Sequence, residues 1–129
     1  MHIEHLAIWV SDLETMRAFY TRYFGATAGA VYLNPVKQFQ SIFLSFENGP
    51  RIELMKMPGI PASANDPYRQ FTGLVHFAIS VGSAHAVDEM ADRLKGDGFE
   101  LIDGPRITGD GYYECVFLDP EKNRIEITA

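Results

Sequence analysis

The chain has 129 residues, of which 47% are hydrophobic and 12% aromatic, so it can bury a core and does not have a disordered composition. Its net charge of −6, without a basic cluster, argues against nucleic acids and anionic membranes as partners. The single cysteine, Cys115, excludes an internal disulfide, and the longest apolar run, 6–10, is far too short for a membrane span. We therefore expect a cytoplasmic protein.

The first half of the chain reads as a strand, a helix and three further strands. Residues 2–10 alternate between apolar and polar side chains, as a strand does. Ser11 then begins a helix, Glu14 completes a capping box three residues later, and Gly25 supplies the C-terminal stop. The later strands are predicted over 28–32, 39–46 and 51–55.

The second half repeats this order after a segment rich in proline, glycine and serine, 57–72. A strand is predicted over 74–81, and a helix begins at Ser83 and ends near Gly96. The remaining strands are expected over 99–103, 112–118 and 124–128. The predicted organisation is thus a first module over 1–56, a linker over 57–72 and a second module over 73–129.

Each module has the order β-α-β-β-β and is too small to bury both the apolar stripe of its helix and a face of its sheet. The sequence therefore predicts an α+β fold in which the two modules pair into one compact domain. Their strands are expected to form a curved mixed sheet, with the helices outside.

Two short segments occur once in each module. His5 opens the segment HLAIWV and His76 opens HFAISV, while Glu53 lies in RIEL and Glu126 in RIEI. In all four strands the aliphatic residues share one parity and face the helices, so the imidazoles and carboxylates lie on the opposite face. A lone His or Glu on a strand is most often solvated, but repetition at matching positions favours a metal site.

The predicted ligands of this site are His5, Glu53, His76 and Glu126. Two imidazoles and two carboxylates suit one divalent transition metal, which is Zn, Ni, Co, Mn or Fe. Four protein ligands around a six-coordinate ion leave two positions for a small-molecule substrate with oxygens on adjacent carbons. The metal would stabilise an enediolate, and a glutamate released from it would carry the proton. His2 and His85 are predicted to lie on the surface.

At these residues the chain resembles the vicinal oxygen chelate superfamily, which includes glyoxalase I, bleomycin resistance proteins and extradiol dioxygenases. The resemblance covers essentially the whole chain, and its most specific part is the run FLDPEKNRIE over 117–126. This run is similar to the family pattern F-x-D-P-x-G-N-x-I-E-L, with Lys122 in place of the usual glycine. The four predicted ligands match the His-Glu-His-Glu pattern of glyoxalase I, which implies that Glu53 and Glu126 are the catalytic residues for proton transfer.

The resemblance implies a glyoxalase I-like isomerase or lyase that acts on a metal-chelated hemithioacetal or a related α-hydroxycarbonyl compound. Small bacterial glyoxalase I enzymes carry Arg and Asn for glutathione where this chain has Trp9 and Met57, so a more apolar substrate or another thiol is expected. The predicted substrate-binding residues are Trp9, Met57, Lys37, Arg106, Tyr112 and Tyr113.

Two other functions within the superfamily stay open at this stage. One is a non-catalytic protein that binds an aromatic toxin or antibiotic, and the other is a dioxygenase, which would require Fe(II) and oxygen. The family also implies a homodimer, in which a site forms either within one chain or between two.

Overall fold

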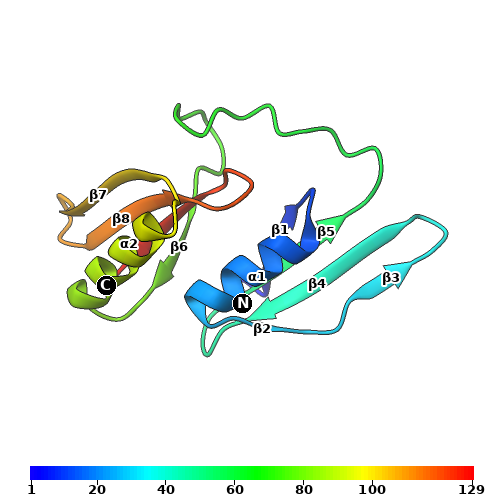
Figure 1. Cartoon of the computed structure of the whole chain (residues 1–129), viewed down its shortest axis with the longest axis horizontal. Helices are drawn as coiled ribbons and strands as arrows, with labels where there is room; N and C mark the ends of the chain where they lie inside the picture. Colours follow the sequence, from blue (N-terminus) through cyan, green and yellow to red (C-terminus); the bar gives the residue numbers. More distant parts are fainter. The chain divides into compact units, whose positions relative to one another are not determined.

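One helix and one mixed sheet make up each half of the computed structural model, which describes residues 1–129 (Figure 1). The halves are two units, Met1–Ser63 and Ala64–Ala129, so the boundary falls inside the segment predicted as a linker. Residues 57–76 contain neither helix nor strand. The sequence predicted one shared sheet, whereas the structure has two, a sheet of five strands and a sheet of four. Neither helix has the length and apolar character needed to cross a membrane.

The first unit holds the helix α1, Leu13–Phe24, and a sheet with the strand order β1-β5-β4-β2, in which β3 pairs with β4. Its strands are β1 His5–Trp9, β2 Thr27–Ala28, β3 Tyr32–Asn34, β4 Phe39–Ser45 and β5 Arg51–Lys56. β1 runs parallel to β5, and the other pairs are antiparallel. The strand expected over 28–32 is divided into β2 and β3.

Helix α1 begins one residue later than the sequence suggested. Asp12, not Ser11, is the N-cap, and its Oδ1 accepts hydrogen bonds from the backbone N–H groups of Glu14 at 3.0 Å and Thr15 at 3.1 Å. The hydrogen bonds from Thr15 and Glu14 hold the pKa of Asp12 below its usual value. Gly25 ends the helix in the left-handed conformation, with φ 64°, as predicted.

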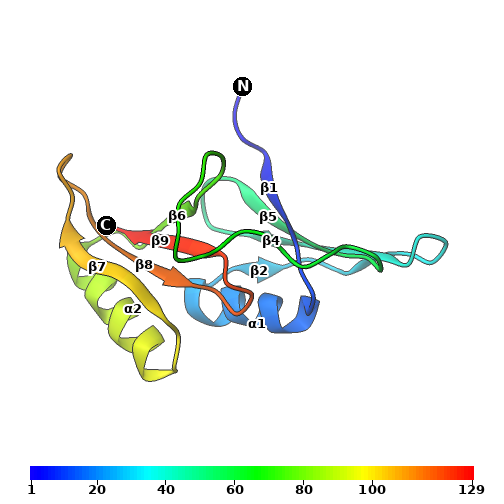
Figure 2. The same ribbon diagram turned by 90° about the horizontal axis from the view of Figure 1, so that it is seen from above.

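The apolar side of α1 packs on one face of its sheet and forms the core of the first unit (Figure 2). The helix contributes Leu13, Met16, Phe19, Tyr20 and Tyr23, all of them buried. The sheet contributes the alternate residues Ile42, Leu44, Ile52 and Leu54. Since side chains alternate along a strand, the residues between these positions, Glu53 among them, lie on the other face.

The second unit repeats this plan with the helix α2, Ala84–Gly96, and the strand order β6-β9-β8-β7. Its strands are β6 Phe77–Ser80, β7 Leu101–Ile107, β8 Tyr113–Leu118 and β9 Arg124–Thr128. β6 runs parallel to β9, as β1 does to β5. Ser83 is the N-cap of α2, as expected, and its Oγ accepts the backbone N–H of Ala86 at 3.2 Å.

The turn between β8 and β9 is organised by one buried carboxylate. Asp119 is 2% exposed, and its Oδ1 accepts the backbone N–H groups of Glu121 and Asn123, both at 2.9 Å. Its Oδ2 accepts the side-chain amide of Asn123 at 2.8 Å. Lys122 has φ 69°, a conformation that glycine adopts at no steric cost. This turn brings β9, and with it Glu126, into register beside β8.

Replacing Lys122 by glycine is expected to stabilise the protein. Glycine removes the cost of ~1–2 kcal/mol that a side chain pays in the left-handed conformation. Its greater freedom in the unfolded chain offsets ~0.5–1 kcal/mol of this gain in stability. The ion pair between Lys122 Nζ and Glu100 Oε2, at 3.3 Å, is exposed and contributes little. Urea denaturation should therefore give Lys122→Gly a free energy of unfolding roughly 0.5–1 kcal/mol above wild type.

Lys122→Ala is the matched control, because it removes the same ion pair and keeps the backbone cost. An alanine variant as stable as the glycine variant would show that the conformation at Lys122 carries no strain.

Candidate metal centre

The first unit brings His5 and Glu53 together on the sheet face opposite α1. The parallel register of β1 and β5 pairs Ala7 with Glu53, so that His5 lies diagonally across from the carboxylate on the same face. The His5 Nε2 atom lies 3.8 Å from Glu53 Oε2. The imidazole is 38% exposed, whereas the carboxylate side chain is only 16% exposed. A largely buried acid therefore lies beside an imidazole that remains accessible.

The second unit contains the matching pair, His76 and Glu126. β6 and β9 pair Ala78 with Glu126, and His76 lies immediately before β6. The distance from His76 Nε2 to Glu126 Oε2 is 3.3 Å, and the two side chains are again 38% and 16% exposed. The repeat therefore preserves the exposure of the two residues as well as their identity.

The separation within each pair is close to that of two ligands of one metal ion. Ligand atoms ~2.1 Å from a transition metal lie about 3.0–3.5 Å apart at octahedral to tetrahedral angles. The His76–Glu126 distance falls inside this range, and the His5–Glu53 distance lies slightly above it. Nowhere does the structure gather three or more His, Cys, Asp or Glu side chains as metal ligands, so each unit shows two of the four predicted ones. A shared four-ligand centre stays a prediction.

His5 is held by neighbours that the sequence analysis did not identify. Its Nδ1 forms a hydrogen bond with the carboxylate of Glu4, which also binds the guanidinium of Arg51. These two contacts, with His5 the larger, hold the pKa of Glu4 below its usual value. The edge of the His5 ring meets Phe43 at 5.4 Å between centroids, and Arg51 lies over the Phe43 ring at 4.1 Å. Only the position of Glu4 directly before His5 could have indicated this role.

In the second unit, Glu126 lines a hollow of about 390 Å³. The other lining residues are Ala78, Thr108, Asp110, Tyr112, Glu114 and Thr128. Of the seven lining residues, three carry carboxylates, two are threonines and one is a tyrosine. The hollow therefore suits a small molecule with polar oxygen groups.

Glu114 is a second acid in this hollow and was also absent from the sequence prediction. It is 8% exposed, and burial together with the nearby carboxylate of Glu126 raises its pKa, while Arg106, 3.6 Å away, opposes this. Glu114 pairs across the strands with Thr128, two residues beyond Glu126, so both acids share one face. Side-chain parity along β8 and β9 was the signal that could have found it.

The predicted substrate-binding residues are distributed over both units. In the first, Trp9 lies on the same face as His5, and its ring meets Phe39 edge to face at 6.1 Å. Met57 lines a different hollow of about 450 Å³, together with Leu33, Pro35, Gln38, Gln40, Lys56 and Pro58. Lys37 lies in the turn between β3 and β4 and is exposed.

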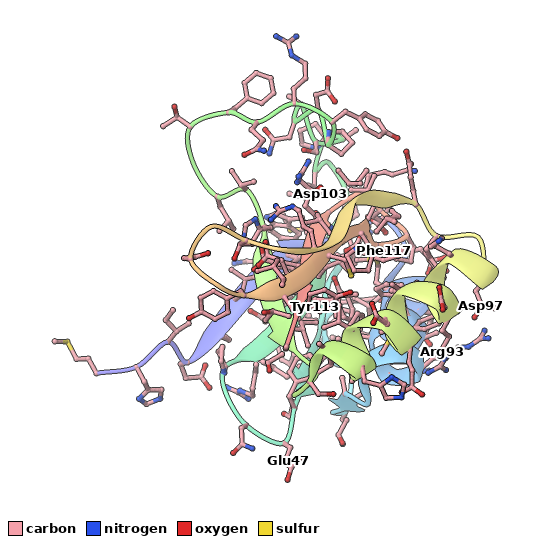
Figure 3. The ribbon with its side chains drawn as sticks, turned by 90° about the vertical axis from the view of Figure 1, so that its left-hand side faces the viewer. Glu47, Arg93, Asp97, Asp103, Tyr113 and Phe117 are labelled. Atoms are coloured by element: carbon pink, nitrogen blue, oxygen red, sulfur yellow. The ribbon has the colours of Figure 1, made fainter.

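In the second unit, Tyr112 lines the hollow but Tyr113 does not. The Tyr113 hydroxyl donates to Asp88 of α2 at 2.7 Å, because alternation turns Tyr113 and Phe117 toward the helix (Figure 3). Arg106 Nε donates a hydrogen bond to Asp103 Oδ2 at 2.7 Å. Because Asp103 engages the guanidinium, Arg106 is only partly free to bind a substrate anion.

Cys115 lies on β8 beside Glu114 and is expected to be chemically inert. Its side chain is 1% exposed, and burial raises the pKa of the thiol to about 12. Because the thiolate is the reactive form, native protein at pH 8 should not react with Ellman's reagent. Unfolded protein should release one equivalent of chromophore per chain, and rapid labelling of the native protein would contradict the buried position.

Comparisons with known proteins agree with the fold and the repeat. The sequence profile of the Glyoxalase/Bleomycin resistance protein/Dioxygenase superfamily matches residues 2–127. The uncharacterized protein YwkD of Bacillus subtilis is 31% identical over 126 residues, which cover 97% of this chain and 94% of the relative.

Among solved structures, a glyoxylase/bleomycin resistance protein/dioxygenase domain from Frankia sp. has a TM-score of 0.81 at 20% identity. The similarity covers 99% of this chain and 96% of that one. The trypanothione-dependent glyoxalase I of Leishmania major has a TM-score of 0.78 at 21% identity, over 99% and 86% of the two chains. At these identities the likeness establishes the fold of two β-α-β-β-β modules.

Proposed function

Because the chain belongs to the Glyoxalase/Bleomycin resistance protein/Dioxygenase superfamily, we propose that it is a metal-dependent isomerase or lyase of glyoxalase I type. The observation that carries the proposal is the repeated His–Glu pair, which has matching exposure in both units and, in the second unit, the separation of two ligands of one metal ion. In the proposed site His5, Glu53, His76 and Glu126 hold one divalent transition metal. We further propose a homodimer, the commonest form of homo-oligomer.

A bound divalent metal would supply Lewis acidity to a substrate carbonyl or hydroxyl. The residues of the chain move the proton. Glu53 and Glu126 are the two candidate acid–base groups, because each is mostly shielded from water and each lies beside an imidazole. One carboxylate would take the proton from the carbon next to the carbonyl, and a carboxylate would return it to the adjacent carbon.

The proposed substrate is a hemithioacetal or a related α-hydroxycarbonyl compound whose thiol part is more apolar than glutathione. Trp9 lies on the same sheet face as His5 and offers an aromatic surface rather than a cation. Met57 lines a hollow of mixed polar and apolar character in the same unit. The glyoxalase I of Leishmania major uses trypanothione, according to its description, so this fold accepts thiols other than glutathione.

The Glu126→Gln variant tests the catalytic part of this proposal. The amide keeps the shape of the side chain but cannot accept a proton, so turnover of the metal-loaded protein should fall at least ~10²-fold. The assay follows hemithioacetals of methylglyoxal with a panel of thiols, from glutathione to benzyl mercaptan.

The control is Glu89→Gln on the exposed surface of α2, where the side chain is 68% exposed and turnover should not change. Metal content is measured for both variants, so that loss of metal is distinguished from loss of the base. Near-normal turnover of Glu126→Gln would remove Glu126 from the chemistry.

A second candidate function is the binding of an aromatic compound without catalysis. It is favoured by a row of three aromatic rings in the first unit, in which Phe39 contacts Trp9 at 6.1 Å and Tyr32 at 6.2 Å. Trp9 is the only tryptophan of the chain, and it is 41% exposed. Its emission therefore reports directly on ligands that reach this row.

Titration of Trp9 fluorescence separates the two functions. For the proposed enzyme, quenching by aromatic hemithioacetals should weaken strongly after treatment with a chelator, because the metal holds the oxygens of the ligand. Tight quenching that is the same with and without chelator would favour the binding protein.

A further inference from the structure

We propose that Glu4 is a positioning residue, which fixes the His5 ring so that its Nε2 lone pair is available to the metal. The inference rests on the proposed metal centre, and it adds to that centre a residue outside the four ligands. It also distinguishes the two half-sites, which are otherwise alike in residue type and exposure.

The two nitrogens of the His5 ring have different partners. Nδ1 is hydrogen-bonded to the Glu4 carboxylate, which can only accept, so the proton of the neutral ring belongs on Nδ1. Nε2 faces Glu53 Oε2 at 3.8 Å, which is too long for a hydrogen bond. With the proton on Nδ1, the lone pair is on Nε2, the ring nitrogen that lies 3.8 Å from the carboxylate that would share the metal. A carboxylate behind a histidine ligand is a general means of fixing its tautomer and orientation.

Glu4 is itself held in place by Arg51. The guanidinium binds the second carboxylate oxygen of Glu4, and the Arg51 backbone N–H donates to the Glu4 carbonyl at 3.1 Å. Arg51 lies over the ring of Phe43 at 4.1 Å, and the same ring meets the edge of His5. His5, Glu4, Arg51 and Phe43 thus form a closed circuit of contacts, which restricts the rotation of the imidazole.

The second unit keeps the histidine and the arginine of this circuit but lacks its carboxylate and its aromatic ring. Val75 precedes His76, and Val116 takes the cross-strand place opposite Glu126 that Phe43 takes opposite Glu53. Arg124 repeats Arg51, but its Nη1 donates to the Pro67 carbonyl at 2.8 Å. The repeat of the modules therefore does not account for Glu4, which supports His5 alone.

The loss of Glu4 should leave the fold intact, so that a change in His5 or in metal binding can be assigned to the missing carboxylate. The Glu4 side chain is 53% exposed, and exposed ion pairs contribute little to the free energy of unfolding. Wild type is compared with Glu4→Gln and Glu4→Ala. A fourth protein, Glu89→Ala on α2, is the control for the loss of an exposed carboxylate.

The first readout needs no metal. Long-range ¹H–¹⁵N spectra of the apo protein, above the pH at which histidine titrates, report the tautomer of His5. Wild type should show the proton on Nδ1, and Glu4→Ala should shift His5 toward the Nε2–H form while His76 keeps its spectrum. An unchanged His5 tautomer in Glu4→Ala would overturn the proposal, whether or not the protein binds a metal.

The second readout is the affinity for Zn²⁺ or Ni²⁺, measured by competition with a chromophoric chelator. Glu4→Ala should weaken binding by ~10–100-fold, as is typical for the loss of a partner behind a metal ligand. Glu4→Gln should lie between, because its amide oxygen still accepts from Nδ1, and Glu89→Ala should match wild type. If wild type binds no metal, the proposed function fails. If wild type binds and Glu4→Ala binds equally well, only the role of Glu4 fails.

Discussion

The site depends above all on the parallel pairing of the first and last strands within each unit. This pairing sets Ala7 beside Glu53 and Ala78 beside Glu126, with a histidine two residues before each alanine. Because the helix covers one face of the sheet, alternation leaves imidazole and carboxylate together on the other face. A slip of one residue in either register would turn the acid into the core, where an unpaired carboxylate is very costly.

The same backbone plan supports two different environments. In the first unit, His5 contacts Glu4 and Phe43, and Arg51 holds both of these, so the motion of the ring is limited. In the second, Glu126 shares a hollow with another buried acid, Glu114. Rigid support of a ligand and a protected place for a proton are both requirements of metal-assisted acid–base chemistry. In the proposed site the two modules would meet different requirements while keeping the same His–Glu pair.

Hydropathy and turn chemistry were sufficient to predict the repeated order of elements, the start of α2 at Ser83 and the end of α1 at Gly25. The N-cap of α1 was missed because Ser11 and Asp12 are adjacent and both accept hydrogen bonds well, so the sequence does not separate them. The two histidines and two glutamates were predicted from the repeat of their segments, and strand parity placed them on the face opposite the helices. Glu4 could not be found in this way, since its contacts depend on where Arg51 and Phe43 lie across the sheet.

The central claim is that both His–Glu pairs serve one metal ion, and metal content per chain tests it most directly. Tag-free protein, purified and then reconstituted with Ni, Co, Zn or Mn, is compared with the double variant His5→Ala/Glu126→Ala, which removes one ligand from each unit. The account predicts about one transition metal per chain in wild type and little in the variant. A wild-type protein that holds no metal after reconstitution would contradict it.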